Sequence, residues 1–281
     1  MKGYDPVIFD LDGTVVDTVE LIRESFRYSV RTVLGREFPD EHILAGVGQP
    51  LMTQMRRLSA EHAQELYDVY REYNHRRHDE LIRGYDGMRE LLEGLRASRR
   101  RLGIVTSKSR DTTQMAFAAV GLGEYFDAVV TASDSDEHKP SPVPLRLCLE
   151  RLGGARAAAG SGGGEPDDGA AEALGPIYVG DSPVDIVAGR AAGMATVAVD
   201  WGVFSREELL AVEPDFYVAT PAELLTLCLD GAAPGRHAGE AGEETPPVRR
   251  AGEPGEAGSP ASSASPSSAS AEGAAGDGAA P

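Results

Sequence analysis

Two carboxylates stand one residue apart directly after a short apolar run. Asp10 and Asp12 follow the apolar residues 7–9, and Gly13 and Thr14 come next. The run predicts a buried strand, and both acids would then lie at the rim of a sheet. Acids near such a core are costly unless they are paired or bind a metal. The pair therefore fits chemistry in which one carboxylate attacks phosphorus, the other transfers protons, and a divalent cation balances the charge.

Further polar groups recur downstream, each just beyond the carboxyl end of a predicted strand. They are Thr106, Ser107 and Lys108 after residues 102–105, Lys139 in the loop after residues 128–131, and Asp181 and Asp185 after residues 177–179. In a parallel sheet these ends meet at one edge, where ligands bind in open α/β folds. We therefore expect the groups to form one site.

The carboxylates of this set are suited to Mg²⁺, which prefers oxygen ligands and uses few carboxylates. Asp10 and Asp181 suffice as carboxylate ligands, and Asp12 can contribute its backbone carbonyl. The Asp12 carboxyl is then free to protonate a leaving group and later to deprotonate a water molecule. Asp10 is left as the nucleophile. For Asp185 two interpretations stay open: it caps the helix that follows, or it orients Lys139 or a metal-bound water from behind the site.

The remaining groups are candidates for binding phosphate. Gly13 would let the backbone turn beside the phosphate, Thr106 can donate a hydrogen bond to it, and Lys139 supplies a fixed positive charge. Ser107 is a further candidate. Lys108 opens an exposed turn, where a lysine is usually solvated.

The rest of the chain alternates short apolar runs with helical patterns, which predicts a parallel sheet covered on both faces. The strand candidates are residues 6–9, 102–105, 128–131, 177–179, 195–199 and 216–218. Helix-start patterns occur at Ser182-Pro183 and Thr220-Pro221. The expected fold class is α/β, a doubly wound parallel sheet.

One segment breaks the alternation. Between Thr14 and about Arg83 we find only helical patterning and no strand candidate, which indicates an inserted α-helical cap above the strand ends. The expected organisation is a catalytic core at 1–16 and 84–229, a helical cap at 17–83, and a disordered acidic low-complexity tail at 230–281. A glycine-rich stretch at 153–175 is expected to be a flexible insertion in the core.

The motifs, in this order, resemble those of haloacid dehalogenase-superfamily phosphatases. The resemblance rests on Asp10-Leu11-Asp12-Gly13-Thr14, Thr106, Lys139-Pro140 and Gly180-Asp181-Ser182-x-x-Asp185. It covers residues 7–229 apart from the glycine-rich stretch. It implies a Rossmann-like core, a helical cap between the first two motifs, and Mg²⁺-dependent hydrolysis through an aspartyl-phosphate. The presence of a second acid, Asp12, resembles the pattern of the phosphatases rather than that of the metal-independent dehalogenases, which lack an acid at this position.

Narrower likenesses concern the substrate. Gly46-Val47-Gly48-Gln49-Pro50-Leu51 and Gly193 resemble the phosphoglycolate phosphatase-like branch, whereas residues 70–75, His78-Asp79 and residues 108–112 resemble PpaX-type bacterial pyrophosphatases. The second likeness implies inorganic pyrophosphate as substrate, with 2-phosphoglycolate or another small phosphomonoester as the alternative. The polar residues 74–78 are either a solvated helix face or a grip for a second phosphate.

Two other functions remain as rivals. A phosphosugar mutase on the same scaffold would return the phosphate to a sugar instead of to water. A catalytically silent scaffold would act through its acidic tail rather than through Asp10.

Composition limits the partners. A formal net charge of −18 argues against nucleic acid as a partner and against an anionic membrane surface. Cys148 and Cys228, far apart in sequence, indicate buried thiols rather than a disulfide framework or a zinc site. No leader or spanning apolar run is visible, so we expect a cytoplasmic monomer or weak dimer acting on a small phosphorylated compound.

Overall fold

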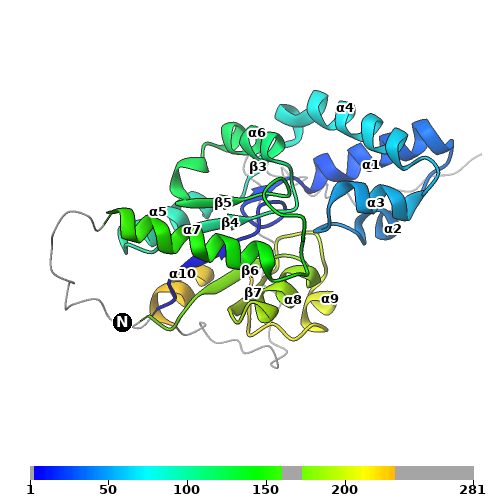
Figure 1. Cartoon of the computed structure of the whole chain (residues 1–281). Helices are drawn as coiled ribbons and strands as arrows, with labels where there is room; N and C mark the ends of the chain where they lie inside the picture. Colours follow the sequence, from blue (N-terminus) through cyan, green and yellow to red (C-terminus); the bar gives the residue numbers. More distant parts are fainter. Residues whose placement is uncertain (1–2, 160–172, 232–281) are drawn as a thin grey trace, which may run out of the picture.

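A computed structural model of the chain describes residues 3–159 and 173–231. A six-stranded parallel sheet forms its centre, in the order β5-β4-β1-β6-β7-β8 (Figure 1). The strands are β1 (Val7–Phe9), β4 (Leu102–Val105), β5 (Ala128–Val130), β6 (Ile177–Gly180), β7 (Ala195–Val199) and β8 (Phe216–Val218). Each lies within one residue of a predicted strand, and the doubly wound α/β fold class is confirmed.

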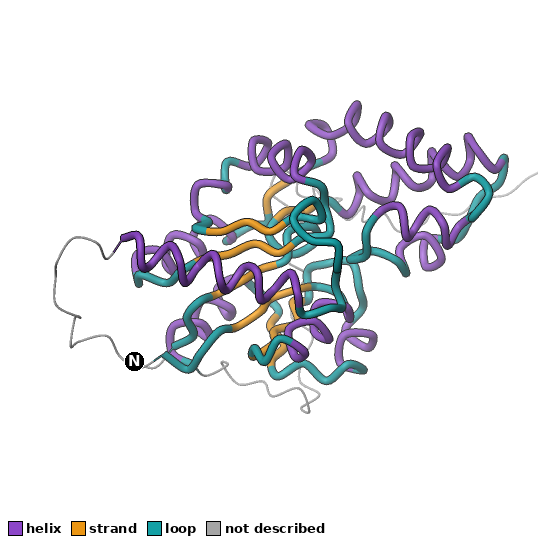
Figure 2. The backbone as a smooth tube through the Cα atoms, in the orientation of Figure 1, coloured by secondary structure: helices purple, strands orange, loops and turns teal. Residues whose placement is uncertain are grey.

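Helices cover both faces of this sheet, as the tube in Figure 2 shows. The helices are α5 (Met88–Ala97), α6 (Arg110–Val120) and α10 (Pro221–Asp230) on one face, α7 (Val143–Ala159) and α8 (Pro183–Ala191) on the other, and the short α9 (Arg206–Leu210) beside β7 and β8. Successive strand residues point to opposite faces. Phe9 accordingly packs in the cluster beneath α5 and α10, and Ile8 in the cluster beneath α7 and α8.

The strand order places the chain's polar loops together. The chain moves outward from β1 to β4 and β5 and then returns to the other side of β1 as β6. Phe9 is in register with both Ile104 and Val179, so β1, β4 and β6 end at nearly the same level. The loops that carry Asp10, Thr106 and Asp181 therefore leave the sheet side by side, at its topological switch point.

A helical module follows β1 and lies apart from the sheet (Figure 1). It consists of α1 (Val19–Leu34), α2 (Asp40–Leu44), α3 (Leu51–Leu58) and α4 (Ala63–Leu81). These helices share their own apolar cluster, which includes Phe26, Met55 and Leu66. We propose that this module is the cap expected at 17–83.

Two connections join the module to the core, and they pair with each other. Strand β2 (Val16–Asp17) runs antiparallel to β3 (Arg83–Gly84). The expectation that no strand lies between Thr14 and Arg83 is therefore wrong. Two-residue strands are too short to show an alternating pattern, and their pairing depends on a contact far away in sequence.

The glycine-rich stretch is partly helical. Helix α7 continues through Gly153 and Gly154 to Ala159, where the alanines that follow the glycines favour a helix. Residues 160–172 and the expected tail from 232 onward lie outside the described residues, so the flexible insertion and the disordered tail stay predictions. No helix within the described ranges has both the length and the apolar character needed to cross a membrane.

Candidate active site

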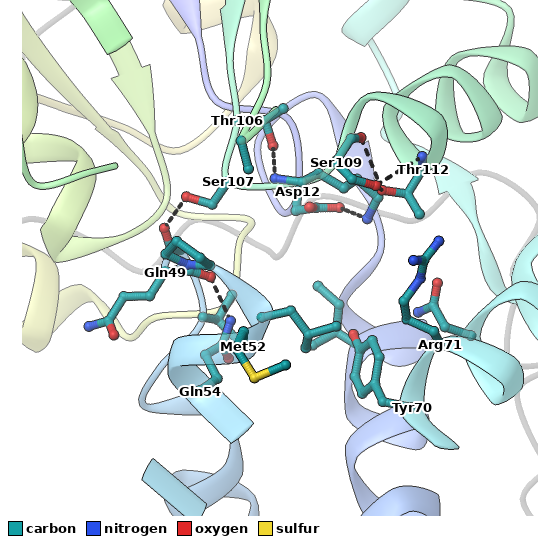
Figure 3. A pocket seen from close by; sticks show the side chains of 18 of the residues that line it. Asp12, Gln49, Met52, Gln54, Tyr70, Arg71, Thr106, Ser107, Ser109 and Thr112 are labelled. Carbon is teal, nitrogen blue, oxygen red and sulfur yellow. Dashed lines mark hydrogen bonds and ion pairs between the residues drawn. The ribbon is translucent and has the colours of Figure 1, made fainter. Parts of the chain in front are cut away.

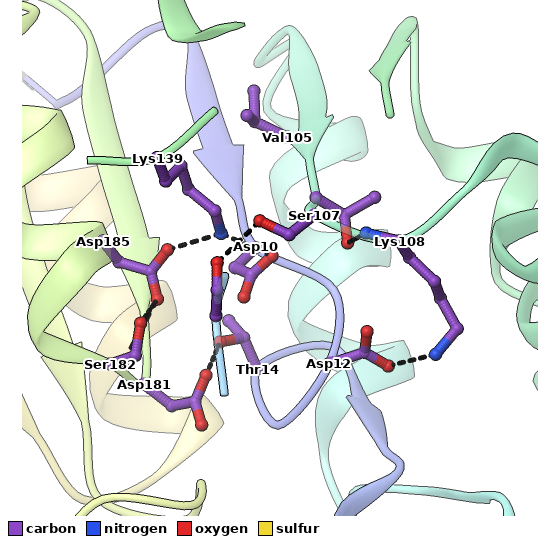
Figure 4. A network of polar contacts seen from close by, with 12 residues as sticks. Asp10, Asp12, Thr14, Val105, Ser107, Lys108, Lys139, Asp181, Ser182 and Asp185 are labelled. Atoms are coloured by element: carbon purple, nitrogen blue, oxygen red, sulfur yellow. Dashed lines mark hydrogen bonds and ion pairs between the residues drawn. The ribbon is translucent and has the colours of Figure 1, made fainter. Parts of the chain in front are cut away.

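Three carboxylates, from the residues directly after β1 and β6 and from the start of α8, meet at the carboxyl edge of the sheet (Figure 4). They are Asp10, Asp181 and Asp185, each buried, and each offers an oxygen within 4.8 Å of the others'. The sequence therefore predicted correctly that these three acids lie together. Only the sheet could bring this about, because Asp10 and Asp181 are far apart in the chain.

Lys139 lies between two of these acids. Its Nζ is 2.9 Å from Asp10 Oδ1 and 2.6 Å from Asp185 Oδ1, and its side chain is 1% exposed. Burial alone would lower the pKa of the Lys139 ammonium, but the two carboxylates raise this pKa above its ordinary value. The side chain therefore stays positively charged inside the protein.

Asp185 satisfies both interpretations left open by the sequence. Its Oδ2 accepts a hydrogen bond of 3.1 Å from the Ser182 backbone N–H, which completes the capping box of α8. Its Oδ1 accepts from Lys139 Nζ at 2.6 Å and lies 3.1 Å from the Tyr178 hydroxyl. Asp185 thus caps a helix and orients Lys139 at the same time.

Asp181 is held by groups that sequence reasoning missed. Its Oδ1 accepts from the Thr14 hydroxyl at 3.0 Å and its Oδ2 from the Val203 N–H at 2.8 Å. Thr14 belongs to the first motif and could have been suspected, whereas nothing in the sequence points to Val203. Gly13 makes this approach possible: its φ is +77°, and a Cβ there would lie 2.3 Å from Asp181 Oδ2.

Asp12 lies at the rim rather than in the buried cluster. Its side chain is 18% exposed, and its Oδ1 accepts from the Thr18 hydroxyl at 2.7 Å. Lys108 Nζ lies 2.7 Å from the same oxygen. Thr18, which the sequence analysis did not single out, immediately precedes α1, so Asp12 contacts the connection to the helical module as well as the core.

The two hydroxyl candidates after β4 have different surroundings. Thr106 is buried, and its Oγ1 accepts a hydrogen bond of 3.2 Å from the Lys108 backbone N–H. Ser107 donates from its Oγ to the Gly48 carbonyl oxygen at 2.6 Å. Ser107 therefore joins the core to the loop between α2 and α3 of the helical module.

A cavity of about 230 Å³ lies between the core and the helical module (Figure 3). Residues of both parts line it: Asp10, Asp12, Thr106, Ser107 and Lys108 from the core, and Gln49, Met52, Tyr70, Arg71, Asn74 and His75 from the module, among others. A cavity of this size is below the range typical of drug-sized ligands and suits a small substrate.

The polar residues 74–78 of α4 have different surroundings. Asn74 and His75 line the cavity, whereas the Arg76 guanidinium lies over the rings of Tyr28 and Tyr73. Arg77 Nε pairs with Glu80 at 2.9 Å. The grip on a second phosphate that was considered for this run is therefore limited to its first two residues.

The charge of the buried cluster fits a divalent cation. Burial raises the pKa of Asp10 well above its ordinary value; Lys139 opposes this, and Asp185, Asp181 and Asp12 raise the pKa further. Burial and then Asp185 raise the pKa of Asp181 to about 7. Asp10 Oδ1 receives no hydrogen bond from the described residues and meets only the ion pair with Lys139. Carboxylate oxygens short of positive charge are donors that hard divalent cations prefer.

Comparison with known proteins agrees with this geometry. Residues 7–199 match the family model described as haloacid dehalogenase-like hydrolase. The chain belongs to this family. Members of it typically use a divalent metal, and the hydrolase class expected from the motifs is confirmed.

Proteins of similar sequence narrow the likeness within this family. A pyrophosphatase PpaX from Bacillus velezensis is 37% identical over 224 residues, which cover 80% of this chain and 96% of the relative. One from Bacillus cereus is 35% identical, with the same coverage. The resemblance to PpaX-type proteins, expected from the residues around α4 and after β4, is confirmed.

Solved structures share the fold. A haloacid dehalogenase-like hydrolase from Streptococcus pneumoniae aligns with a TM-score of 0.63 at 26% identity, over 80% of this chain and 97% of that one. A hydrolase from Pseudomonas syringae aligns with a TM-score of 0.66 at 23% identity, over 82% and 99%. The second of these likenesses concerns the fold alone.

The contact between the module and the core generates a test. Gly48 has a φ of +92°, and a Cβ there would lie 2.7 Å from Val184 Cγ2 and 2.9 Å from Ser182 Oγ. Gly48→Ala should push the module away from the core and misplace the cavity wall. We expect kcat/KM for p-nitrophenyl phosphate to fall by about 100-fold with the circular dichroism spectrum unchanged.

Gly35→Ala is the matched control. Gly35 also has a positive φ, +62°, but nothing lies within 4 Å of a Cβ placed there. This variant should lose some stability and keep its activity. Equal losses of activity in both variants would mean that backbone strain, rather than the approach of the module to the core, explains the Gly48 result.

Proposed function

We propose that this chain is a Mg²⁺-dependent phosphohydrolase that cleaves inorganic pyrophosphate through an aspartyl-phosphate on Asp10. The observation that carries the proposal is the buried set Asp10, Asp181 and Asp185 with Lys139, of which Asp10 lines the small cavity between the core and the helical module. The pyrophosphatase PpaX relatives, which match over nearly their whole length, support the choice of substrate.

The metal ligands we propose are the Asp10 and Asp181 carboxylates and the Asp12 backbone carbonyl. Asp185 is less suited to direct ligation, because Ser182, Tyr178 and Lys139 already contact its two oxygens. When bound, Mg²⁺ would neutralise the charge of the phosphoryl group and of the carboxylates around it. Thr14 and Val203 keep Asp181 in place for this purpose.

In the first half of the reaction, an Asp10 oxygen attacks the phosphorus atom and forms a bond to it, while the bond to the leaving group breaks. Lys139 fixes the Asp10 carboxyl and lessens its repulsion of the incoming phosphate. Asp12 gives its proton to the leaving oxygen. Its place at the rim, where the Thr18 hydroxyl orients it, suits a group that must reach the leaving side of the substrate.

In the second half, Asp12 takes a proton from water, and the resulting hydroxide attacks the phosphorus atom of the aspartyl-phosphate. The bond between phosphorus and the Asp10 oxygen breaks, which restores the Asp10 carboxylate and releases phosphate. Thr106 is suited to bind a phosphoryl oxygen, because its Oγ1 accepts from Lys108 N–H and its hydroxyl proton remains to donate. Gly13 leaves space for the phosphoryl group and for Asp181.

Replacing the nucleophile tests the mechanism. Asp10→Asn should lower turnover by about three orders of magnitude or more, because an amide cannot form the phosphoenzyme. Asp68→Asn, the same change at an exposed position of α4, should have normal turnover. Near-normal turnover of Asp10→Asn in steady-state phosphate release would contradict the role of Asp10.

Metal binding can be tested without turnover. Mg²⁺ that binds only the folded protein should raise the melting temperature, by an amount that grows with its concentration. Asp181→Asn should remove most of this increase, since one proposed carboxylate ligand is gone, while Asp68→Asn should keep it. An undiminished increase in Asp181→Asn would place the ion elsewhere.

The substrate is decided by comparing kcat/KM for pyrophosphate, 2-phosphoglycolate and a few sugar phosphates. We expect pyrophosphate to be preferred by about 100-fold or more, roughly 3 kcal/mol in transition-state free energy. Preference for 2-phosphoglycolate would keep the mechanism and discard the pyrophosphatase assignment. Transfer of label from a sugar bisphosphate into its isomer instead of into solvent would indicate a mutase.

A further inference from the structure

We propose that Lys108 and Arg71 form a binding subsite for a second anionic group on the leaving side of the substrate, and that a second phosphate suits it best. The inference rests on the proposed function, because it names the groups that would distinguish pyrophosphate from a monoester. It concerns specificity only, since neither side chain is assigned a part in bond cleavage.

Lys108 is not the solvated lysine that its place in a turn suggests. Its side chain is 11% exposed and its Nζ lies 2.7 Å from Asp12 Oδ1 (Figure 4). The backbone is fixed at two points: its N–H donates to Thr106 Oγ1, and its carbonyl accepts from Ala132 N–H at 2.9 Å. These contacts hold the Lys108 backbone beside the cavity that its side chain lines.

The contact of Lys108 with Asp12 can be exchanged without leaving a carboxylate unpaired. Asp12 Oδ1 also accepts from the Thr18 hydroxyl at 2.7 Å, and the side chain is partly exposed. Lys139 differs in this respect, because it is enclosed between Asp10 and Asp185. An anion on the leaving side of the substrate could thus recruit Lys108 without leaving Asp12 unpaired.

Arg71 reaches the same cavity from the opposite wall. In Figure 3 its side chain extends from α4 towards Thr112 of the core. Its guanidinium lies 5.7 Å from the centre of the Tyr67 ring, and among the residues that the structure describes it makes no ion pair. A half-buried guanidinium that lines a cavity without a carboxylate partner is available to an anionic ligand.

The electrostatics of His75 indicate that the two cations face a common space. Burial lowers the pKa of His75; Arg71 and His78 lower it further, Asp111 opposes them, and Lys108 adds a smaller lowering effect. His75 is thus subject to the charge of both proposed subsite residues. One comes from the loop after β4 and the other from α4, so their convergence depends on the module lying against the core.

The order of charges through the cavity gives the subsite its direction. Asp10 is the buried acid that lines the cavity, Asp12 lies at its partly exposed rim, and Lys108 and Arg71 line it from the core and from α4. A substrate whose transferred phosphoryl group faces Asp10 would place its leaving group between the two cations. A phosphate offers several charged oxygens to them, whereas a carboxylate offers two and a neutral alcohol none.

The experiment compares three substrates in Lys108→Met: pyrophosphate, 2-phosphoglycolate and p-nitrophenyl phosphate, whose leaving group carries no second anionic group. We expect kcat/KM for pyrophosphate to fall by roughly 30-fold, as for loss of a charged hydrogen bond, and that for p-nitrophenyl phosphate to change less than about threefold. Arg71→Met should show the same selectivity, and Lys108→Arg should recover much of the preference for pyrophosphate.

Arg110→Met is the matched control. It removes one positive charge two residues away, where the side chain is 58% exposed and pairs with Asp134 outside the cavity. Its ratio of pyrophosphate to p-nitrophenyl phosphate activity should equal that of the unchanged chain. A similar drop in this ratio in the control would mean that net charge, not a subsite, sets the preference, and would overturn the inference.

The remaining outcomes separate the inference from the proposed function. Equal loss on all three substrates in Lys108→Met would overturn the subsite, since Lys108 would then act on Asp12 or on the transferred phosphate. If the unchanged chain prefers 2-phosphoglycolate and Lys108→Met lowers that activity selectively, the anion subsite stands and pyrophosphate is excluded as substrate. If Lys108→Met fails to fold, the same comparison in Arg71→Met decides.

Discussion

The structure depends on one imbalance of charge. Asp10, Asp181 and Asp185 are buried within a few ångströms of one another, Asp12 lies at their rim, and the buried ammonium of Lys139 contacts Asp10 and Asp185. Such an arrangement is expensive in a protein interior, and the raised pKa values of Asp10 and Asp181 are the direct consequence. The fold maintains it by giving each acid fixed partners, and the negative charge that remains suits a divalent cation.

The parallel sheet supplies those partners from positions far apart in sequence. Strands β1 and β6 place Asp10 and Asp181, the capping box of α8 fixes Asp185, and the turn at Gly13 lets Asp181 approach. Each of these structural features is common in proteins. Their coincidence at the switch point of the sheet allows several carboxylates to share one small volume, an arrangement that suits a divalent cation.

The sequence predicted the parts of the fold that local pattern determines. The sequence allowed us to predict the six strands, the helix caps at Ser182 and Thr220, and the meeting of Asp10, Asp181 and Asp185, because each follows from an apolar run and the residues that end it.

The pairing of β2 with β3 was missed because a strand of two residues is too short to show an alternating pattern. Helix α7 runs past Gly153 because its alanines outweigh two glycines, which a reading of the glycines alone does not show. The contacts of Asp12 with Thr18 and Lys108, and of Ser107 with Gly48, depend on how the helical module meets the core, and no local pattern encodes that meeting.

The two lysines of the site show how one fold can keep its chemistry and vary its substrate. Lys139 is enclosed by carboxylates that form no ion pair with another cation of the described residues, so its loss would leave uncompensated charge in the core. Lys108 shares its carboxylate with Thr18 at a partly exposed rim, where an ion pair contributes little to stability. A change at Lys108 or Arg71 would therefore alter what the cavity binds at little cost to folding, whereas a change at Lys139 would affect both. Burial thus separates Lys139, on whose charge the core depends, from Lys108 and Arg71, which we propose can be adapted to a leaving group.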